Sequence, residues 1–98
     1  MTSKKVDLFV NYTPIQIEDF VKQFIKAVIK GILSALKDYR EAQEIKLSID
    51  GDDVNITLDG DNIQLNPFVS TFIKNTITGM VSSLKDVGQI ERLEISIS

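Results

Sequence analysis

The sequence predicts an α+β fold in which one strand–helix–strand unit occurs twice. Shifting the 98-residue chain by 48 positions places residues 15–38 on residues 63–86 without a gap. Across residues 6–50, 16 of 45 aligned positions are identical, whereas unrelated stretches of this composition would share about one in fifteen. In each copy, alternating apolar residues flank a longer stretch with helical periodicity. We therefore expect one domain, residues 1–98, made of two repeats, 6–50 and 54–98.

The first strand of each unit is indicated by strict alternation. Residues 6–12 and 54–58 alternate between apolar and other side chains, as half-buried strands do. An Asp-Gly pair follows the second of these strands, and both residue types tolerate the positive φ of a tight hairpin turn. That turn would return the chain in a short strand at residues 63–65, with residues 15–17 as its counterpart. In the alternative, the chain leads directly into the helix.

The helix starts are predicted from capping residues. Asn66-Pro67 combines an N-cap side chain with a proline whose missing N–H costs nothing at the first helical position. By the duplication, the first helix should begin near Glu18-Asp19, whose charges suit the positive end of the helix dipole. Thr13-Pro14 with Gln16 resembles a capping box and offers an earlier alternative start. Each helix would span about 20 residues, or ~30 Å.

Both helices carry an apolar arc of roughly 220°, wider than the ~100° that a surface helix needs. We expect each helix to contact both the sheet and the other helix, with the whole arc in the core. Gly31 and Gly79 recur in mid-helix, where Gly costs about 1 kcal/mol relative to Ala. We expect a close backbone approach there, so that Gly31→Ala destabilises the fold. The arc comprises Ile17, Phe20, Val21, Phe24, Ile25, Val28, Ile29, Ile32, Leu33 and Leu36, then Phe68, Val69, Phe72, Ile73, Ile77, Met80, Val81 and Leu84.

The remaining strands are predicted at residues 44–50 and 92–98, which alternate in the same way. An acidic, Gly-containing turn at residues 50–53 joins the first of them to residues 54–58 in a hairpin. Two such units give a ferredoxin-like βαββαβ fold, with a four-stranded antiparallel sheet and both helices on one face. If the short strands before the helices form, the alternative is a six-stranded sheet made of two strand–strand–helix–strand halves.

The ferredoxin-like order would place residues 44–50 and 92–98 at the two edges of the sheet. Between positions 93 and 98 the last strand carries one charge and no proline, which is weak protection against pairing with another chain. We therefore expect a homodimer, formed through the sheet edge or through the open face of the sheet. The edge residues concerned are Leu93, Glu94, Ile95 and Ser96.

Composition argues against several classes of site and partner. The chain has no Cys and no His, which removes disulfides, thiolate metal sites and the usual general base. A net charge of −3 at pH 7 argues against a nucleic-acid partner. No run reaches the ~18 apolar residues that a membrane span needs, and the first residues lack an apolar secretion signal. We expect a cytoplasmic protein with no cofactor, no membrane and no nucleic-acid partner.

Acidic side chains gather in two predicted turns, at residues 50–53 and 59–61. Carboxylate-rich loops suit Ca²⁺ or Mg²⁺. The spacing does not match an EF-hand, and a strand between the two loops would hold them about 17–20 Å apart. We interpret these residues as turn formers rather than metal ligands.

A row of lysines and the open sheet face are the other candidate surfaces. Lys22, Lys26 and Lys30 form a row on the first helix, as in helices that lie on anionic membranes. The second helix keeps the apolar arc without the row, so we interpret the lysines as a solvated side. Phe9 is the one aromatic residue expected on the open sheet face, too few for an RNA-recognition sheet.

Together these patterns favour a small non-catalytic protein-interaction or self-association module. No Asp, Glu or Lys interrupts the apolar positions of a predicted strand or helix, so we expect no buried general acid or base and no enzyme. We assign no catalytic, cofactor-binding or metal-binding residue. The alternative from another class is a small-molecule-binding regulatory domain that acts as a dimer, by analogy of fold alone.

Overall fold

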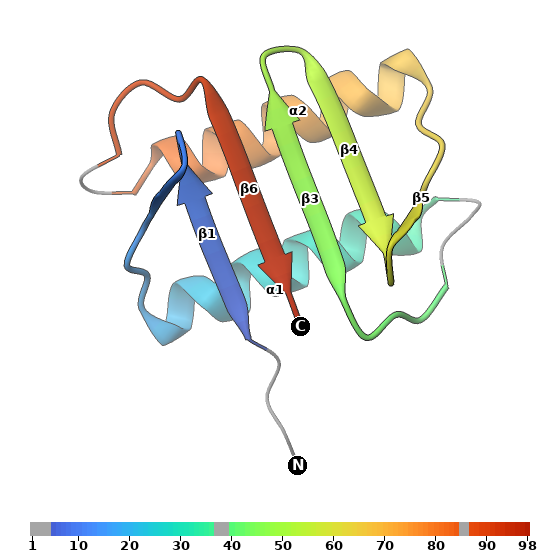
Figure 1. Ribbon diagram of the computed structural model, residues 1–98, viewed down its shortest axis with the longest axis horizontal. Coiled ribbons are helices and arrows are strands. Elements are labelled where there is room, and N and C mark those ends of the chain that lie inside the picture. Colours follow the sequence, from blue (N-terminus) through green and yellow to red (C-terminus); the bar gives the residue numbers. More distant parts are fainter. Residues whose placement is uncertain (1–4, 37–39, 85–86) are drawn as a thin grey trace.

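The computed structural model describes residues 5–36, 40–84 and 87–98, and shows two layers. A six-stranded antiparallel sheet forms one layer, and both helices lie on the same face of it, running in opposite directions (Figure 1). The chain is therefore α+β, as predicted, with more strands than the four of the main prediction. In order along the chain the elements are β1 (Val6–Val10), β2 (Thr13–Pro14), α1 (Asp19–Ser34), β3 (Ile45–Asp50), β4 (Asp53–Leu58), β5 (Asp61–Asn62), α2 (Pro67–Ser82) and β6 (Arg92–Ile97).

The strand order is β2-β1-β6-β3-β4-β5, which corrects the predicted edges. β3 and β6 were expected at the two edges but are the two central strands, paired with each other and with β4 and β1 respectively. The order therefore departs from the ferredoxin-like one. The reason is local: β1 and β4 each use their outer side to pair with the short strand that follows, so only one side remains for a long neighbour.

Two tight hairpins create those short strands. Asn11 and Tyr12 both have positive φ (50° and 67°), and Asp59 and Gly60 repeat this at 50° and 88°, which is the pattern of type I′ turns. An extra short strand before each helix is thus confirmed, but the predicted bounds, 15–17 and 63–65, are wrong: the strands are Thr13–Pro14 and Asp61–Asn62. The ladder continues for one more hydrogen bond on each side, from the Ile15 N–H to the Leu8 carbonyl (2.9 Å) and from the Ile63 N–H to the Ile56 carbonyl (3.0 Å).

Both helices begin near the predicted residues and are shorter than predicted. The Asn66 side chain accepts a hydrogen bond from the Val69 N–H at 2.8 Å, which confirms the predicted N-cap of α2. α1 begins after Glu18, which makes no side-chain cap, and the alternative start at Thr13-Pro14 is wrong because those residues form β2. Each helix has 16 residues, or ~24 Å, and the two start 48 positions apart.

The core lies between the sheet and the helices and is entirely apolar among the described residues. Each helix contributes three buried side chains at intervals of four residues: Ile25, Ile29 and Leu33 from α1, and Ile73, Ile77 and Val81 from α2. Most inward residues predicted for the strands are buried. The exceptions are Val54, which is half-buried, and Tyr12, which is 74% exposed because β1 ends at Val10 and Tyr12 lies in the turn. On the sheet side the core comprises Val6, Leu8, Val10, Ile45, Leu47, Ile49, Ile56, Leu58, Leu93, Ile95 and Ile97.

Candidate interaction surface

Four phenylalanines on the helices are exposed, although the sequence places all four in the core. The exposed fractions are 74% for Phe20, 50% for Phe24, 74% for Phe68 and 58% for Phe72. They form two pairs, each spaced by one helical turn, with ring centroids 6.2 Å apart on α1 and 6.1 Å apart on α2. The prediction of a fully buried apolar arc is therefore wrong for these residues. Each pair lies in the first turns of its helix, and because α1 and α2 run in opposite directions, the two pairs lie near opposite ends of the helix layer. We refer to the four residues together as the aromatic patch.

Helical geometry explains why the phenylalanines stay outside the core. At 100° per residue, Phe20 lies opposite Ile29, the centre of the buried row of α1, and Phe24 lies roughly 140° from it. A row of three aliphatic residues is enough for each helix to cover the sheet. The remaining part of the apolar arc therefore faces away from the sheet or toward the other helix. The signal in the sequence was the width of the arc, which exceeds what one packing contact requires.

An apolar groove of about 480 Å³ lies between the helices beside the first aromatic pair. It lies between the first half of α1 and the second half of α2 with the two residues that follow α2, so that segments about 60 positions apart in the sequence share one surface. None of the side chains that line it is charged. The lining comprises Phe20, Val21, Phe24 and Ile25 from one side, and Thr76, Met80, Val81, Ser83 and Leu84 from the other.

The two mid-helix glycines do not serve packing within the chain. A Cβ atom at Gly31 or Gly79 would meet nothing within 4 Å among the described residues. The expected close backbone approach is therefore absent here. Both glycines are exposed, and Gly31 lies on the same outer side of α1 as Phe20. Both glycines therefore form part of the uncharged outer surface of the helix layer.

The lysine row lies on the other flank of α1 from Phe24. Lys22, Lys26 and Lys30 are half-buried beside the core row rather than fully solvated. In α2 the only charged residue is Lys74, and it forms a salt bridge with Asp52 in the β3–β4 turn. Lys74 donates a hydrogen bond to Asp52 and its charge lies close by, which holds the pKa of that carboxyl below its usual value.

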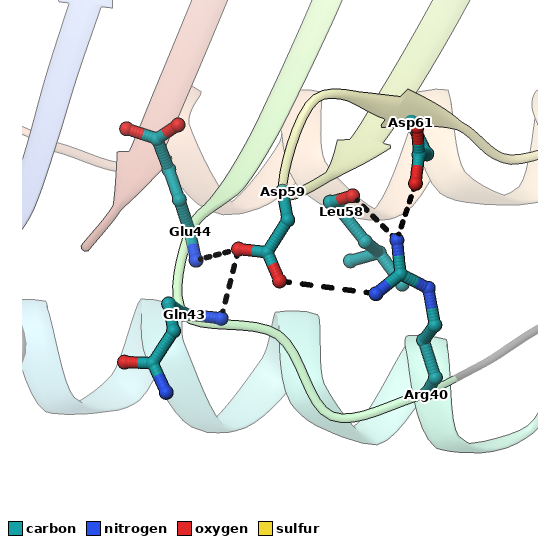
Figure 2. A network of polar contacts seen from close by, with 6 residues as sticks. All are labelled: Arg40, Gln43, Glu44, Leu58, Asp59 and Asp61. Carbon is teal, nitrogen blue, oxygen red and sulfur yellow. Dashed lines mark hydrogen bonds and ion pairs between the residues drawn. The ribbon is translucent and has the colours of Figure 1, made fainter.

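The acidic turn at residues 59–61 joins two segments of the chain through hydrogen bonds and ion pairs (Figure 2). One carboxylate oxygen of Asp59 accepts hydrogen bonds from the backbone N–H groups of Gln43 (3.0 Å) and Glu44 (2.9 Å). Arg40 donates to the Leu58 carbonyl at 3.0 Å and to the Asp61 carboxylate at 2.7 Å, and lies 3.8 Å from Asp59. These contacts fasten the segment before β3 to the turn after β4.

Asn11 makes the corresponding contacts in the other half of the chain. The sequence patterns did not predict this role of Asn11. Its Oδ1 accepts hydrogen bonds from the backbone N–H groups of Glu91 and Arg92, both at 2.9 Å, and its Nδ2 donates to the Gln89 carbonyl at 2.9 Å. The available signal was the 48-position shift, which places Asn11 on Asp59. The guanidinium of Arg92 also lies 5.1 Å from the centre of the Tyr12 ring.

Two carboxylates of the acidic turn at residues 50–53 form ion pairs within the chain. Asp50 pairs with Arg92 at 3.1 Å, and Asp52 pairs with Lys74. Within residues 5–36, 40–84 and 87–98, no group of three or more His, Cys, Asp or Glu side chains is placed to hold a metal ion. Lys37, which follows the lysine row in the sequence, lies outside the described residues.

The predicted association edge is in the interior of the sheet. Leu93 and Ile95 are buried under the helices, and β6 is paired on both sides. Glu94 and Ser96 point to the open face of the sheet, where they are half-buried. Edge pairing through these four residues is therefore wrong, because their backbone groups already bond within the sheet.

Comparison with known proteins gives no relative for this chain. No family model matches it, and neither the curated proteins nor the solved structures contain a match. In the described part of the chain, no helix combines the length and the apolar content that crossing a bilayer requires.

Proposed function

We propose that this protein is a non-catalytic protein-interaction module whose docking face is the helix layer. The observation that carries the proposal is the aromatic patch. Its exposed fractions amount to about two and a half complete side chains, on the order of 500 Å² at a typical Phe area. Because the two pairs lie near opposite ends of the helix layer, each exposes on the order of 250 Å². Exposed apolar patches of a few hundred Å² on small proteins are often functional. Burying them against a partner would remove this area from water.

The arrangement of the two halves supports a docking role for the whole layer rather than for one helix. The phenylalanines occupy the same positions in α1 and α2, 48 residues apart, and both helices lie on the same face of the sheet. We interpret this repetition as an inherited duplication of one strand–strand–helix–strand unit. A cytoplasmic location remains part of the proposal.

Site-specific photo-crosslinking tests the docking face and requires no assumption about the identity of the partner. A benzophenone amino acid replaces Phe24 in one variant and Asn55 in the other; Asn55 is exposed on the open sheet face and serves as the matched control. We expect a protein adduct, with another copy or with a different chain, from position 24 in an extract of the source cells. Adducts only from position 55, or equal yields from both, would contradict the proposal.

A second candidate function, binding of an apolar small molecule, is favoured by the groove between the helices. Its volume of about 480 Å³ falls within the ~300–1,000 Å³ of small-molecule sites. Thr76 and Ser83 supply the polar side-chain groups among its lining residues. A thermal-shift screen with fatty acids and apolar heterocycles tests this function. We expect a ligand to raise the Tm of the wild-type protein but not that of Met80→Trp, in which the larger side chain fills the groove. A screen in which no compound raises the Tm counts against small-molecule binding.

A further inference from the structure

We propose that the partner of the aromatic patch is a second copy of this chain, in a two-fold dimer with the helix layers face to face and the sheets outside. This inference rests on the proposed function, since it assumes that the helix layer is the docking face. It replaces pairing through β6, which the strand order places inside the sheet, with contact through the helix layer.

The area of the patch fits a dimer of this size. A standard interface buries about 800 Å² on each partner. The phenylalanines alone supply on the order of 500 Å². Apolar side chains between the helices that are only half-buried, such as Ile32 and Met80, add to it. The phenylalanines therefore supply more than half of the area that a standard interface buries on each partner, before any contribution from the sheet.

The shape of the surface suits contact with itself. A two-fold interface brings the same patch of both copies together, so the patch must complement itself. The helix layer carries both parts of such a contact: an aromatic ridge, Phe68 with Phe72, and a groove lined in part by Phe20 and Phe24. A groove of about 480 Å³ is large enough to receive aromatic rings from a facing ridge.

The two mid-helix glycines gain a role in this dimer. Each is helical, exposed and unneeded by packing within the chain, although Ala in its place would favour the helix. Glycine on a helix surface allows another backbone or a large side chain to approach closely. Gly31 and Gly79 lie on the outer side of the helices, where a facing copy would pack.

Charge favours a second copy over a lipid surface. Helices that lie on anionic bilayers combine apolar residues with cations along the same face. Here the only cation of α2, Lys74, is engaged with Asp52, and the lysines of α1 lie on the flank away from Phe24. The outer surface of α2 is uncharged, so two copies can meet there without repulsion between like charges.

Sedimentation equilibrium and light scattering test the dimer directly. We expect the wild-type chain to show twice its mass of 11.0 kDa at up to about 200 µM, where a micromolar Kd is detected. The double variant Phe24→Ser/Phe72→Ser should weaken association at least about 30-fold, as loss of interface hot spots does. Tyr12→Ser, which removes an exposed aromatic ring outside the helices, is the matched control and should leave the mass unchanged.

Folding of each variant is checked by circular dichroism and by its urea midpoint. A wild-type monomer at the highest concentration, or a folded double variant that remains as dimeric as wild type, would overturn the inference. If the chain is monomeric but position 24 still crosslinks to a different protein, the proposed docking face stands and only the second copy is refuted. Wild-type chain that is monomeric and floats with anionic phosphatidylserine vesicles, while the double variant does not float, would instead identify a lipid-binding face and overturn the dimer.

Discussion

Replacing Asp59 tests how the hairpin turns hold the segments that precede the central strands. Asp59→Ala removes the acceptor for the backbone N–H groups of Gln43 and Glu44, at 3.0 and 2.9 Å. Each of the two hydrogen bonds contributes about 1 kcal/mol, and placing Ala at a φ of 50° costs ~1 kcal/mol. We therefore expect Asp59→Ala to lower the free energy of unfolding by about 3 kcal/mol. Asp59→Asn keeps an acceptor oxygen and tolerates the same φ. Asp59→Asn weakens only the ion pair with Arg40, so we expect it to lower the free energy of unfolding by less than about 1 kcal/mol.

The reciprocal exchange at Asn11 should have the opposite outcome. Asn11→Asp keeps the oxygen that accepts from Glu91 and Arg92 but removes the Nδ2 donor. A carboxylate oxygen would then face the Gln89 carbonyl oxygen, which now lies 2.9 Å from Nδ2. An unsatisfied and repelled acceptor costs about 1–3 kcal/mol. The same pair of residue types is therefore nearly interchangeable at position 59 and not at position 11.

Urea unfolding at pH 7, at one fixed protein concentration, measures these differences. The free energies are comparable if the dependence on urea is unchanged between variants. A fixed concentration is needed because association would add to apparent stability. The proposed stabilising role of these hydrogen bonds would be refuted if Asp59→Asn destabilised the protein as much as Asp59→Ala, or if Asn11→Asp were neutral.

Two further predictions concern glycine and pH. Gly31→Ala should raise the free energy of unfolding by about 1 kcal/mol in the Phe24→Ser/Phe72→Ser background, because the site is helical and open, contrary to the sequence-based expectation. Gly60→Ala should lower the free energy of unfolding by ~1–2 kcal/mol because φ is +88°. If the two glycine substitutions changed the free energy of unfolding in the same direction, this prediction would be wrong. The depressed pKa of Asp52 means that its pair with Lys74 stabilises the fold fully above the ordinary Asp value of 3.8 and is lost as pH falls through the lower folded value. The difference in Tm between wild type and Asp52→Asn should therefore be present at pH 7 and vanish in strong acid; a difference independent of pH would contradict the ion pair.

The aromatic patch shows where sequence patterning loses information. An apolar arc of roughly 220° identifies a helix with more than one apolar side, but not which side meets the sheet. Ile25 and Phe24 are neighbours in the same arc, yet one is buried and the other is half exposed. The rotation of the helix on the sheet decides between them, and that rotation depends on the fit of the aliphatic row Ile25, Ile29 and Leu33 against the strands.

Local patterns in the sequence predicted which residues alternate, the tight turn at Asp59-Gly60 and where the helices start, but not the tight turn at Asn11-Tyr12. The inward side chains of β3 and β6 and the cap at Asn66 follow from periodicity and local hydrogen bonding, which depend on near neighbours in the chain. The order of the strands was decided only by the tertiary structure. Once the Asn11 and Asp59 turns pair β1 and β4 with β2 and β5, those long strands have one free side each, and β3 and β6 must fill the centre. Competition for the two sides of a strand is a property of the assembled sheet, so no single stretch of sequence records its outcome.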